Sequence, residues 1–539
     1  MEPLQALARV ADRAEAWRRL AWPERAALLR ACSRSAARRI RVWAEVSCRL
    51  KGADPASRWL GEEALLGPAI TLRHLRLYAA TLAAGPGTPR AAAAREAAPG
   101  QLALPVFPGD RWDGWLHPGV RAEVWLAPAA APARRSGGPG GVAAVLGAGN
   151  VSSIPPLDAL HQLLYEDRVA VVKLNPLMAP LAPVFAAALA PLVERGFLAF
   201  VAGGAEEGAA LLGDERVDAV HLTGSHRTFD AIVWGAGEEG ERRRAAGEPL
   251  LRKPVTAELG CVSPLLVVPE RWDRADLRQQ AFAVAGMVVN NGSFNCNAPK
   301  LILTSRHWPQ RQAFLRELRA ALAAAPPRPA WYPGAAERWA RFAERYPQAE
   351  SWGEAGAGEL PWLLVPEVPA EPGQPALSEE AFCGVVAECP LDAAGSEEFL
   401  DQAVRFANDH VWGSLSCTIL AAPTTPRPAL ERALAGLRYG GVAVNAWAAL
   451  LFALGQTTWG AFPGEPPEDI RSGRGHVHNT GLLAQPQKSV LRAPFRPPLR
   501  PLWDPRHRFL RAAGLRLARF EARPSPARLL SLAAAAVLG

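Results

Sequence analysis

The chain has 539 residues, of which 49% are hydrophobic and 21% are charged, and its formal net charge is +8. This length exceeds what one hydrophobic core normally supports, so we expect two or three globular domains. The N-terminus lacks the basic and apolar regions of a signal peptide, and no apolar run approaches the roughly 20 residues that span a bilayer. These features argue against a secreted or membrane-spanning protein, and we expect a cytoplasmic one.

Seven cysteines and an uneven charge distribution narrow the functional class. The cysteines have no CxxC spacing, which indicates free thiols in a reducing compartment and argues against a disulfide framework or a zinc site. Residues 488–528 carry eleven Lys or Arg against two acidic residues, so the rest of the chain is close to neutral. A neutral body with a basic tail argues against a nucleic-acid enzyme.

The first half of the chain predicts helices followed by a parallel sheet. Residues 1–84 repeat apolar positions at helical spacing, whereas residues 85–119 are rich in Pro, Gly and Ala and are expected to be irregular. Strand-like runs then alternate with helical ones, which predicts a parallel sheet covered on both faces. Ligands bind such sheets at the carboxyl ends of the strands, where Asn150, Lys173 and Gly224 fall. The expected strands are 121–126, 141–146, 168–173, 197–201 and 219–222.

The stretch from Glu258 to Cys296 carries the strongest chemical signal. Each of these two residues stands beside glycine or asparagine, where the backbone can bend sharply and approach a ligand. A thiolate is a strong nucleophile, and a nearby carboxylate can act as a general base for a later water. The pair suits two-step acyl chemistry, although a buried packing thiol and a solvated acid explain the same two residues.

Several motifs, taken in order, resemble those of the aldehyde dehydrogenase superfamily. The resemblance covers roughly residues 120–480 and depends on the order and spacing of the motifs more than on any one of them. The chain is therefore identified as a divergent, bacterial-type member. The motifs are Leu222-Thr223-Gly224-Ser225, Glu258-Leu259-Gly260, Glu379-Glu380-Ala381-Phe382, Asn408 to Leu415, Gly441 to Asn445, and Ser472-Gly473-Arg474-Gly475.

The resemblance implies an α/β fold with a Rossmann-like cofactor domain, an α/β catalytic domain and a small oligomerisation flap. Residues 1–256 would form the N-terminal helices and the dinucleotide-binding domain, and a flap strand would lie near 120–140. Residues 257–440 would form the catalytic domain. Residues 441–487 would form the return and oligomerisation segment, and 488–539 the basic tail. A homodimer or homotetramer is implied as well.

The implied reaction is the oxidation of a small-molecule aldehyde to a carboxylic acid with NAD or NADP. Cys296 would attack the carbonyl carbon, Asn150 would hold the oxyanion, and Glu258 would activate the water that hydrolyses the thioester. Lys173 would contact the hydroxyl groups of the adenosine ribose. The remaining cofactor-binding residues would be Gly224 and Ser225 at the pyrophosphate, and Glu380 and Phe382 at the nicotinamide ribose.

Departures from the family pattern affect two of these roles. The loop before Cys296 is one residue longer than the family's Gly-Gln-x-Cys, and an ungapped alignment places Asn295 at the nucleophile position. We retain Cys296, because the loop has no other thiol. Pro176 replaces an acid that would repel a 2′-phosphate, which opens the site to NADP. Cys261 replaces a glycine beside Glu258, and we interpret it as a packing thiol.

Alternatives remain for the reaction and for the tail. An acylating reductase would pass the thioester to coenzyme A, but such members usually lack the Glu258 carboxylate; a catalytically silent scaffold would keep only the fold. Residues 506–520 predict a basic amphipathic helix that docks on its own subunit or a neighbour. The alternative is contact of residues 506–539 with an anionic membrane surface. Phe294 and Trp447 suggest an apolar or aromatic aldehyde.

Overall fold

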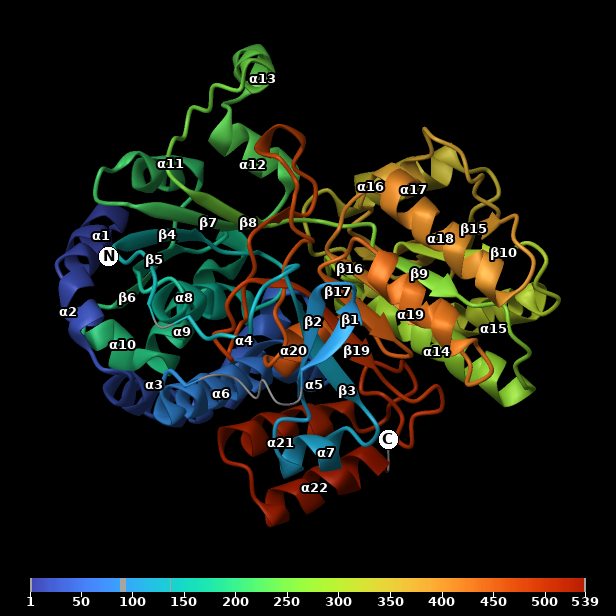
Figure 1. The fold of residues 1–539 in the computed structure, drawn as a ribbon, viewed down its shortest axis with the longest axis horizontal. Coiled ribbons are helices and arrows are strands. Elements are labelled where there is room, and N and C mark those ends of the chain that lie inside the picture. The colour runs from blue at the N-terminus through green and yellow to red at the C-terminus, as the bar shows by residue number, and fades with distance from the viewer. Residues whose placement is uncertain (1, 88–93, 136, 538–539) are drawn as a thin grey trace.

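The computed structural model describes residues 2–87, 94–135 and 137–537. Residues 1, 88–93, 136 and 538–539 lie outside the described part; they fall in the expected helical segment, the irregular connection, the flap region near 120–140 and the tail. Two β-sheets organise the fold, and helices cover them (Figure 1). This arrangement confirms the predicted α/β class.

The first sheet has six strands in the order β18-β8-β7-β4-β5-β6. All of them pair in parallel except β18, which is antiparallel to β8. Every residue of β4 and β7 is buried, as expected for a sheet covered on both faces. The strands are β4 (Val142–Leu146), β5 (Val169–Lys173), β6 (Leu198–Val201), β7 (Ala219–Thr223), β8 (Val255–Glu258) and β18 (Gly473–Arg474).

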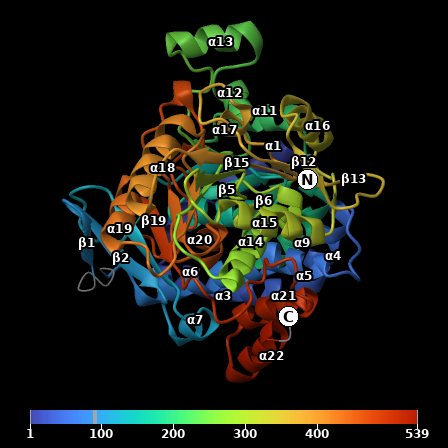
Figure 2. The ribbon, with the colours of Figure 1, turned by 90° about the vertical axis from the view of Figure 1, so that its right-hand side faces the viewer.

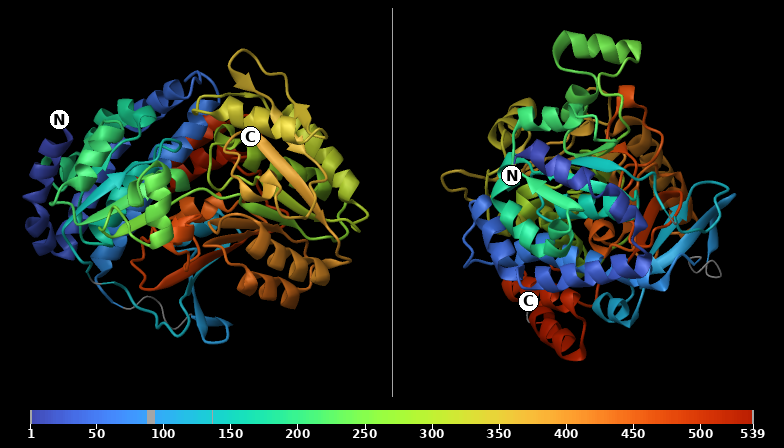
Figure 3. Two further views of the ribbon diagram at one scale, coloured as in Figure 1. Left: turned by 90° about the horizontal axis from the view of Figure 1, so that it is seen from above. Right: turned by 90° about the vertical axis from the view of Figure 1, so that its left-hand side faces the viewer.

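Helices from the N-terminal half of the chain surround this sheet (Figures 1 and 3). Among them, α8 (Ile154–Leu164) is buried along its whole length, including its polar residues Asp158, His161 and Gln162. α13 (Gly237–Ala246) stands clear of the body in Figure 2. The others are α1 (Pro3–Ala11), α2 (Ala14–Arg19), α3 (Trp22–Ala37), α4 (Ile40–Leu50), α5 (Trp59–Ala64), α6 (Ile70–Ala84), α9 (Ala182–Ala188), α10 (Ala190–Glu194), α11 (Ala205–Gly213) and α12 (His226–Val233).

The second sheet has eleven strands in the order β1-β2-β3-β19-β17-β16-β9-β10-β15-β14-β12. Its central strands are parallel, and antiparallel strands complete both edges. The strands are β1 (Arg95–Ala98), β2 (Gln101–Phe107), β3 (Arg121–Leu126), β9 (Pro264–Val267), β10 (Leu301–Ser305), β12 (Glu350–Trp352), β14 (Trp362–Val365), β15 (Val385–Leu391), β16 (Ser416–Leu420), β17 (Gly441–Val444) and β19 (Pro486–Arg492).

Two pairs of helices enclose the parallel part of the second sheet, one pair on each face (Figure 3). The first pair is α14 (Arg274–Val289) and α15 (Arg311–Ala324), and the second is α18 (Ser396–His410) and α19 (Arg427–Gly436). Further elements lie in the connections between these strands and helices. They are α16 (Ala335–Arg345), α17 (Pro375–Ser378), α20 (Ala449–Leu454) and the two-residue strands β11 (Arg328–Pro329) and β13 (Glu359–Leu360).

Residues 85–119 differ from the irregular connection that their composition predicts. Their described part holds β1, β2 and a helix, α7 (Arg111–Leu116). β2 pairs with β3, and β3 pairs with β19. The expected flap strand is therefore β3, and it extends the second sheet. Cross-strand pairing outweighed the low strand propensity of an Ala- and Pro-rich segment. The boundary expected after residue 256 falls inside β8, and residues 488–492 of the expected tail belong to β19.

The basic tail packs on its own chain through α21 (Leu510–Ala522) and α22 (Pro526–Val537). α21 crosses α5 where Gly514 meets Gly61, and a Cβ on Gly514 would lie 2.1 Å from the Gly61 carbonyl oxygen. Glu521 of α21 accepts hydrogen bonds from Arg73 at 2.9 Å and Arg76 at 2.6 Å. The two helices lie at the bottom of Figure 1. In the described part of the chain, no helix is long and apolar enough to cross a membrane.

Candidate active site

The thiol of Cys296 and the carboxylate of Glu258 face each other between the two sheets. Cys296 Sγ donates to Glu258 Oε1 at 3.1 Å. Glu258 is the last residue of β8 and is 2% exposed, and it pairs across the sheet with Gly473 of β18. The φ of Gly473 is +121°, and a Cβ there would lie 2.0 Å from the Ala257 carbonyl oxygen, so only glycine fits. The closing motif of the sequence therefore fixes the position of the acid.

The loop before Cys296 is folded by three successive residues with left-handed backbone. Asn291, Gly292 and Ser293 have φ values of +55°, +67° and +67°. The additional residue of this loop is accommodated by Asn295, whose Nδ2 donates to the Asn290 carbonyl at 3.2 Å. Asn295 therefore points back into the loop, while the next residue presents its thiol to Glu258.

Asn150 follows β4 and lies beside this loop, 7% exposed. Its Nδ2 donates to the Phe294 carbonyl at 2.9 Å, and its side chain lines the same cavity as Cys296. An amide donor thus stands next to the nucleophile candidate, where a developing oxyanion would need one.

Two buried lysines hold the loop, and the sequence analysis missed both. Lys300 Nζ donates to the Ser293 carbonyl and hydroxyl, each at 2.8 Å. Lys51 Nζ donates to Asn291 Oδ1 and Glu63 Oε1, each at 2.8 Å. No periodic pattern marks either residue, although the place of Lys300 directly before β10 could have suggested a buried cation.

Burial governs the electrostatics of the pair. Burial and, to a smaller extent, the charge of Asp158 raise the pKa of Glu258 to about 7, and the hydrogen bond from Cys296 opposes the rise. Burial also raises the pKa of the Cys296 thiol well above its usual value, and the charges of Glu258 and Glu380 add to the effect. At rest, a protonated thiol therefore lies against a carboxyl that titrates near neutrality.

The first group of cofactor candidates lies at the carboxyl ends of the first sheet, as predicted from the strand order. Lys173 is half-buried at the end of β5, and burial lowers its pKa. Gly224 and Ser225 are exposed after β7. Ser225 Oγ accepts from Thr228 N at 3.1 Å and caps α12, whose N-terminus favours an anion such as a pyrophosphate.

Glu380 and Phe382 lie between α17 and β15, next to the catalytic pair. Glu380 Oε1 is buried and has no hydrogen-bond partner among the described residues. Its carboxylate packs against Gly260, where a Cβ would lie 2.1 Å from Oε2. Phe382 has a φ of +43°, and its ring centroid lies 6.0 Å from that of Phe294. An orphaned carboxylate oxygen beside the thiol fits a ribose hydroxyl, so the residues present suit a dinucleotide.

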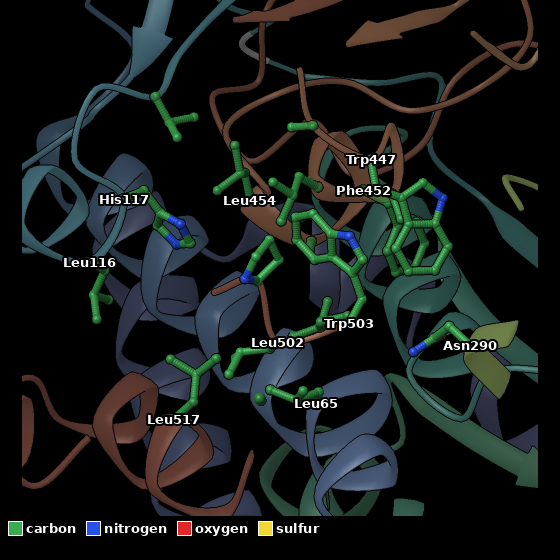
Figure 4. Close-up of a pocket in the computed structure, with 18 of the residues that line it drawn as sticks. Leu65, Leu116, His117, Asn290, Trp447, Phe452, Leu454, Leu502, Trp503 and Leu517 are labelled. Atoms are coloured by element: carbon green, nitrogen blue, oxygen red, sulfur yellow. The ribbon is translucent and has the colours of Figure 1, made fainter. Parts of the chain in front are cut away.

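A cavity of about 340 Å³ is lined by Cys296, Asn150 and residues of the tail. Figure 4 shows part of this lining. Trp447 lines it, and its Nε1 donates to the Asn297 carbonyl at 2.8 Å. Phe294 instead stacks on Tyr332, with ring centroids 5.6 Å apart. Of the two aromatic residues expected beside the substrate, Trp447 thus lies at the cavity, and Phe294 packs behind the loop.

Comparisons with known proteins agree with this geometry. Residues 131–332 match the model of the aldehyde dehydrogenase family. No curated protein matches the sequence significantly. Many solved structures share the fold.

Three of these structures illustrate the likeness. NADP-dependent glyceraldehyde-3-phosphate dehydrogenase from Bacillus halodurans, complexed with NADP, is 16% identical, with a TM-score of 0.62 over 91% of this chain and 90% of that one. An aldehyde dehydrogenase of Mycobacterium tuberculosis, complexed with NAD⁺, is 18% identical, with a TM-score of 0.61 over 90% and 88%. Lactaldehyde dehydrogenase of Escherichia coli is 19% identical, with a TM-score of 0.60 over 91% of both chains. Residues 131–332 thus resemble the aldehyde dehydrogenase family, and the chain as a whole shares the fold of solved aldehyde dehydrogenases.

Proposed function

We propose that the protein oxidises an aldehyde to a carboxylic acid through a thioester on Cys296, with NAD or NADP as the hydride acceptor. The observation that carries the proposal is the 3.1 Å contact between Cys296 Sγ and Glu258 Oε1. It joins a nucleophile to a base in one hydrogen bond, which is the arrangement that covalent catalysis needs.

The first step forms a bond between Cys296 Sγ and the carbonyl carbon, while the thiol proton passes to Glu258. The electron pair of the carbonyl moves to oxygen, where the Asn150 amide and the Cys296 backbone N–H stabilise the negative charge. Loss of a hydride from the same carbon then leaves a thioester. Once Glu258 has released the thiol proton to solvent, it takes a proton from water and the water oxygen attacks the thioester. The C–S bond then breaks to release the acid, and the Cys296 sulfur regains a proton from Glu258.

The dinucleotide, when bound, accepts the hydride. Lys173, Gly224, Ser225, Glu380 and Phe382 are the residues that we propose to hold it. The complexes of similar structures with NAD⁺ or NADP support this assignment. Pro176, which begins the turn after Lys173, places no acid at that position, so both cofactors are candidates.

Hydrolysis is favoured over transfer to coenzyme A because a base for water stands at the thiol. Glu258 Oε2 is buried without a hydrogen-bond partner among the described residues, so it is available to bind a water. A scaffold without catalysis would not need a thiol and a carboxylate in contact inside the fold.

The experiment is to follow the absorbance of reduced nicotinamide with a panel of aldehydes and either cofactor, with and without coenzyme A. We expect turnover without coenzyme A and a free acid as product. Turnover that requires coenzyme A would overturn the hydrolytic assignment, and failure of every aldehyde with both cofactors would overturn the proposed function. We also propose that the protein forms a homodimer or homotetramer. Light scattering would distinguish the two by their molar mass.

A further inference from the structure

The cavity beside Cys296 is walled mostly by apolar side chains. Its volume of about 340 Å³ lies in the usual range of small-molecule sites, roughly 300–1,000 Å³. One wall comes from the body of the protein, and Figure 4 shows Leu65, Trp447, Phe452 and Leu454 around the hollow. Such a wall recognises its ligand by apolar burial and offers few polar contacts.

The charged side chains at the cavity are engaged with other protein groups. Arg500 Nη1 donates to the Arg506 carbonyl at 3.4 Å. Arg73 donates to Asp113 at 2.6 Å and to Glu521 at 2.9 Å. Glu62 forms an ion pair with Arg328 at 2.9 Å. Burial lowers the pKa of His117 to about 4, so this imidazole is neutral at physiological pH. The cavity therefore favours an aldehyde that carries no second charged group.

The C-terminal tail supplies the opposite wall. Leu502 and Trp503 approach from the segment before α21, and the ring centroids of Trp503 and Trp447 lie 6.1 Å apart. α21 contributes Leu517, and Figure 4 shows it pointing towards the same hollow. The lining residues of α22 are Leu529, Leu532, Ala533 and Ala536.

The tail thus extends the cavity well beyond the catalytic pair. We propose that the substrate is an unbranched aliphatic aldehyde with a long chain, whose carbonyl lies at Cys296 and whose chain lies between the body and residues 497–536. This inference rests on the proposed function, because it assigns the aldehyde to that same cavity. The basic tail that the sequence left without a role is then part of the substrate site.

Chain length sets the size of the expected effect. Burial of each additional methylene raises kcat/KM by about fourfold until the cavity is full, after which the gain stops. Propanal reaches only the part near Cys296 and Asn150, whereas hexadecanal extends to α22. Substitutions in α22 should therefore affect long aldehydes selectively.

Neighbouring alanines of α22 provide a matched test. Ala536 lines the cavity, whereas Ala534 is exposed on the same helix and is absent from the lining. We expect Ala536→Trp to lower kcat/KM at least about tenfold for hexadecanal and to leave that for propanal unchanged. Ala534→Trp, which adds the same bulk outside, should change neither. A thermal unfolding curve for each variant verifies that the helix remains folded.

A flat dependence of kcat/KM on chain length, or equal losses in both variants, would overturn the inference while leaving the proposed function intact. Binding of decanol, measured by calorimetry, gives a second readout that needs no turnover. If no aldehyde is oxidised, the proposed function fails. Decanol binding that Ala536→Trp abolishes and Ala534→Trp preserves would still support the cavity assignment, and absence of binding to the unmodified protein would overturn it.

Discussion

The titration of Glu258 offers the sharpest quantitative prediction. Its pKa is raised to about 7, first by burial and then by the charge of Asp158. Below this pH the carboxyl is protonated and cannot accept a proton from water or from the Cys296 thiol. Above it, the carboxylate is the base that the reaction needs, so activity should rise with pH through neutrality.

The magnitude follows from the ionised fraction. With a pKa of about 7, roughly one-tenth of Glu258 is ionised at about pH 6 and roughly nine-tenths at about pH 8, so kcat should rise about tenfold between them. Glu258→Gln should lower kcat about 10²–10⁴-fold and remove this rising limb, because an amide cannot act as the base.

The assay is a series of steady-state measurements with one aldehyde and saturating cofactor across this pH range. Asp158→Asn serves as the matched control, since it removes a negative charge near Glu258 without altering the pair itself. It should move the rising limb to lower pH, because the raised pKa depends in part on that charge. An unchanged limb in Glu258→Gln would refute the reasoning, because the titrating group would then lie elsewhere.

Three further substitutions test the support of the site. Asn150→Ala should lower kcat by about 10²–10³-fold and leave the Kd of the cofactor unchanged in a fluorescence titration; an unaltered kcat would remove Asn150 from the oxyanion role. Lys300→Met removes the two hydrogen bonds to Ser293 and should lower the free energy of unfolding in urea by about 1–3 kcal/mol, whereas an unchanged free energy of unfolding would contradict the role of Lys300 in holding the loop. Asn291→Ala should be less stable than Asn291→Gly by about 1–2 kcal/mol, since alanine is strained at a φ of +55°; equal thermal stability would show that the backbone relaxes.

The strand ends of the first sheet were predictable from the sequence. Asn150, Lys173 and Gly224 follow β4, β5 and β7, and parallel strands end on the same edge of a sheet. Apolar runs between turn residues mark such strands clearly. The pairing of Glu258 with Cys296 needed the family resemblance, because no local pattern brings together residues that are 38 positions apart.

Other features depend on contacts that leave no periodic trace in the sequence. Lys51 bonds to Asn291 across 240 positions, and both are buried polar groups that only the folded chain brings together. β2 lies in an Ala- and Pro-rich segment whose strand character arises from pairing with β3. The cavity joins α5, α20 and the tail, so its apolar lining is scattered over the whole sequence.

The most direct test of the thioester mechanism is to trap the acyl group. Glu258→Gln slows the hydrolytic water step, and it also removes a negative charge that raises the pKa of the Cys296 thiol. At alkaline pH, where the thiol can lose its proton to solvent, mixing this variant with an aldehyde and cofactor should therefore leave an acyl adduct that peptide mass spectrometry locates on Cys296. Cys296→Ser, added to the Glu258→Gln variant, should carry no adduct and form no reduced cofactor. Cys261→Ser in the same variant alters a buried packing thiol and should still give both the adduct and the reduced cofactor. An adduct on any other residue, or turnover that survives in Cys296→Ser, would contradict the proposed role of this thiol.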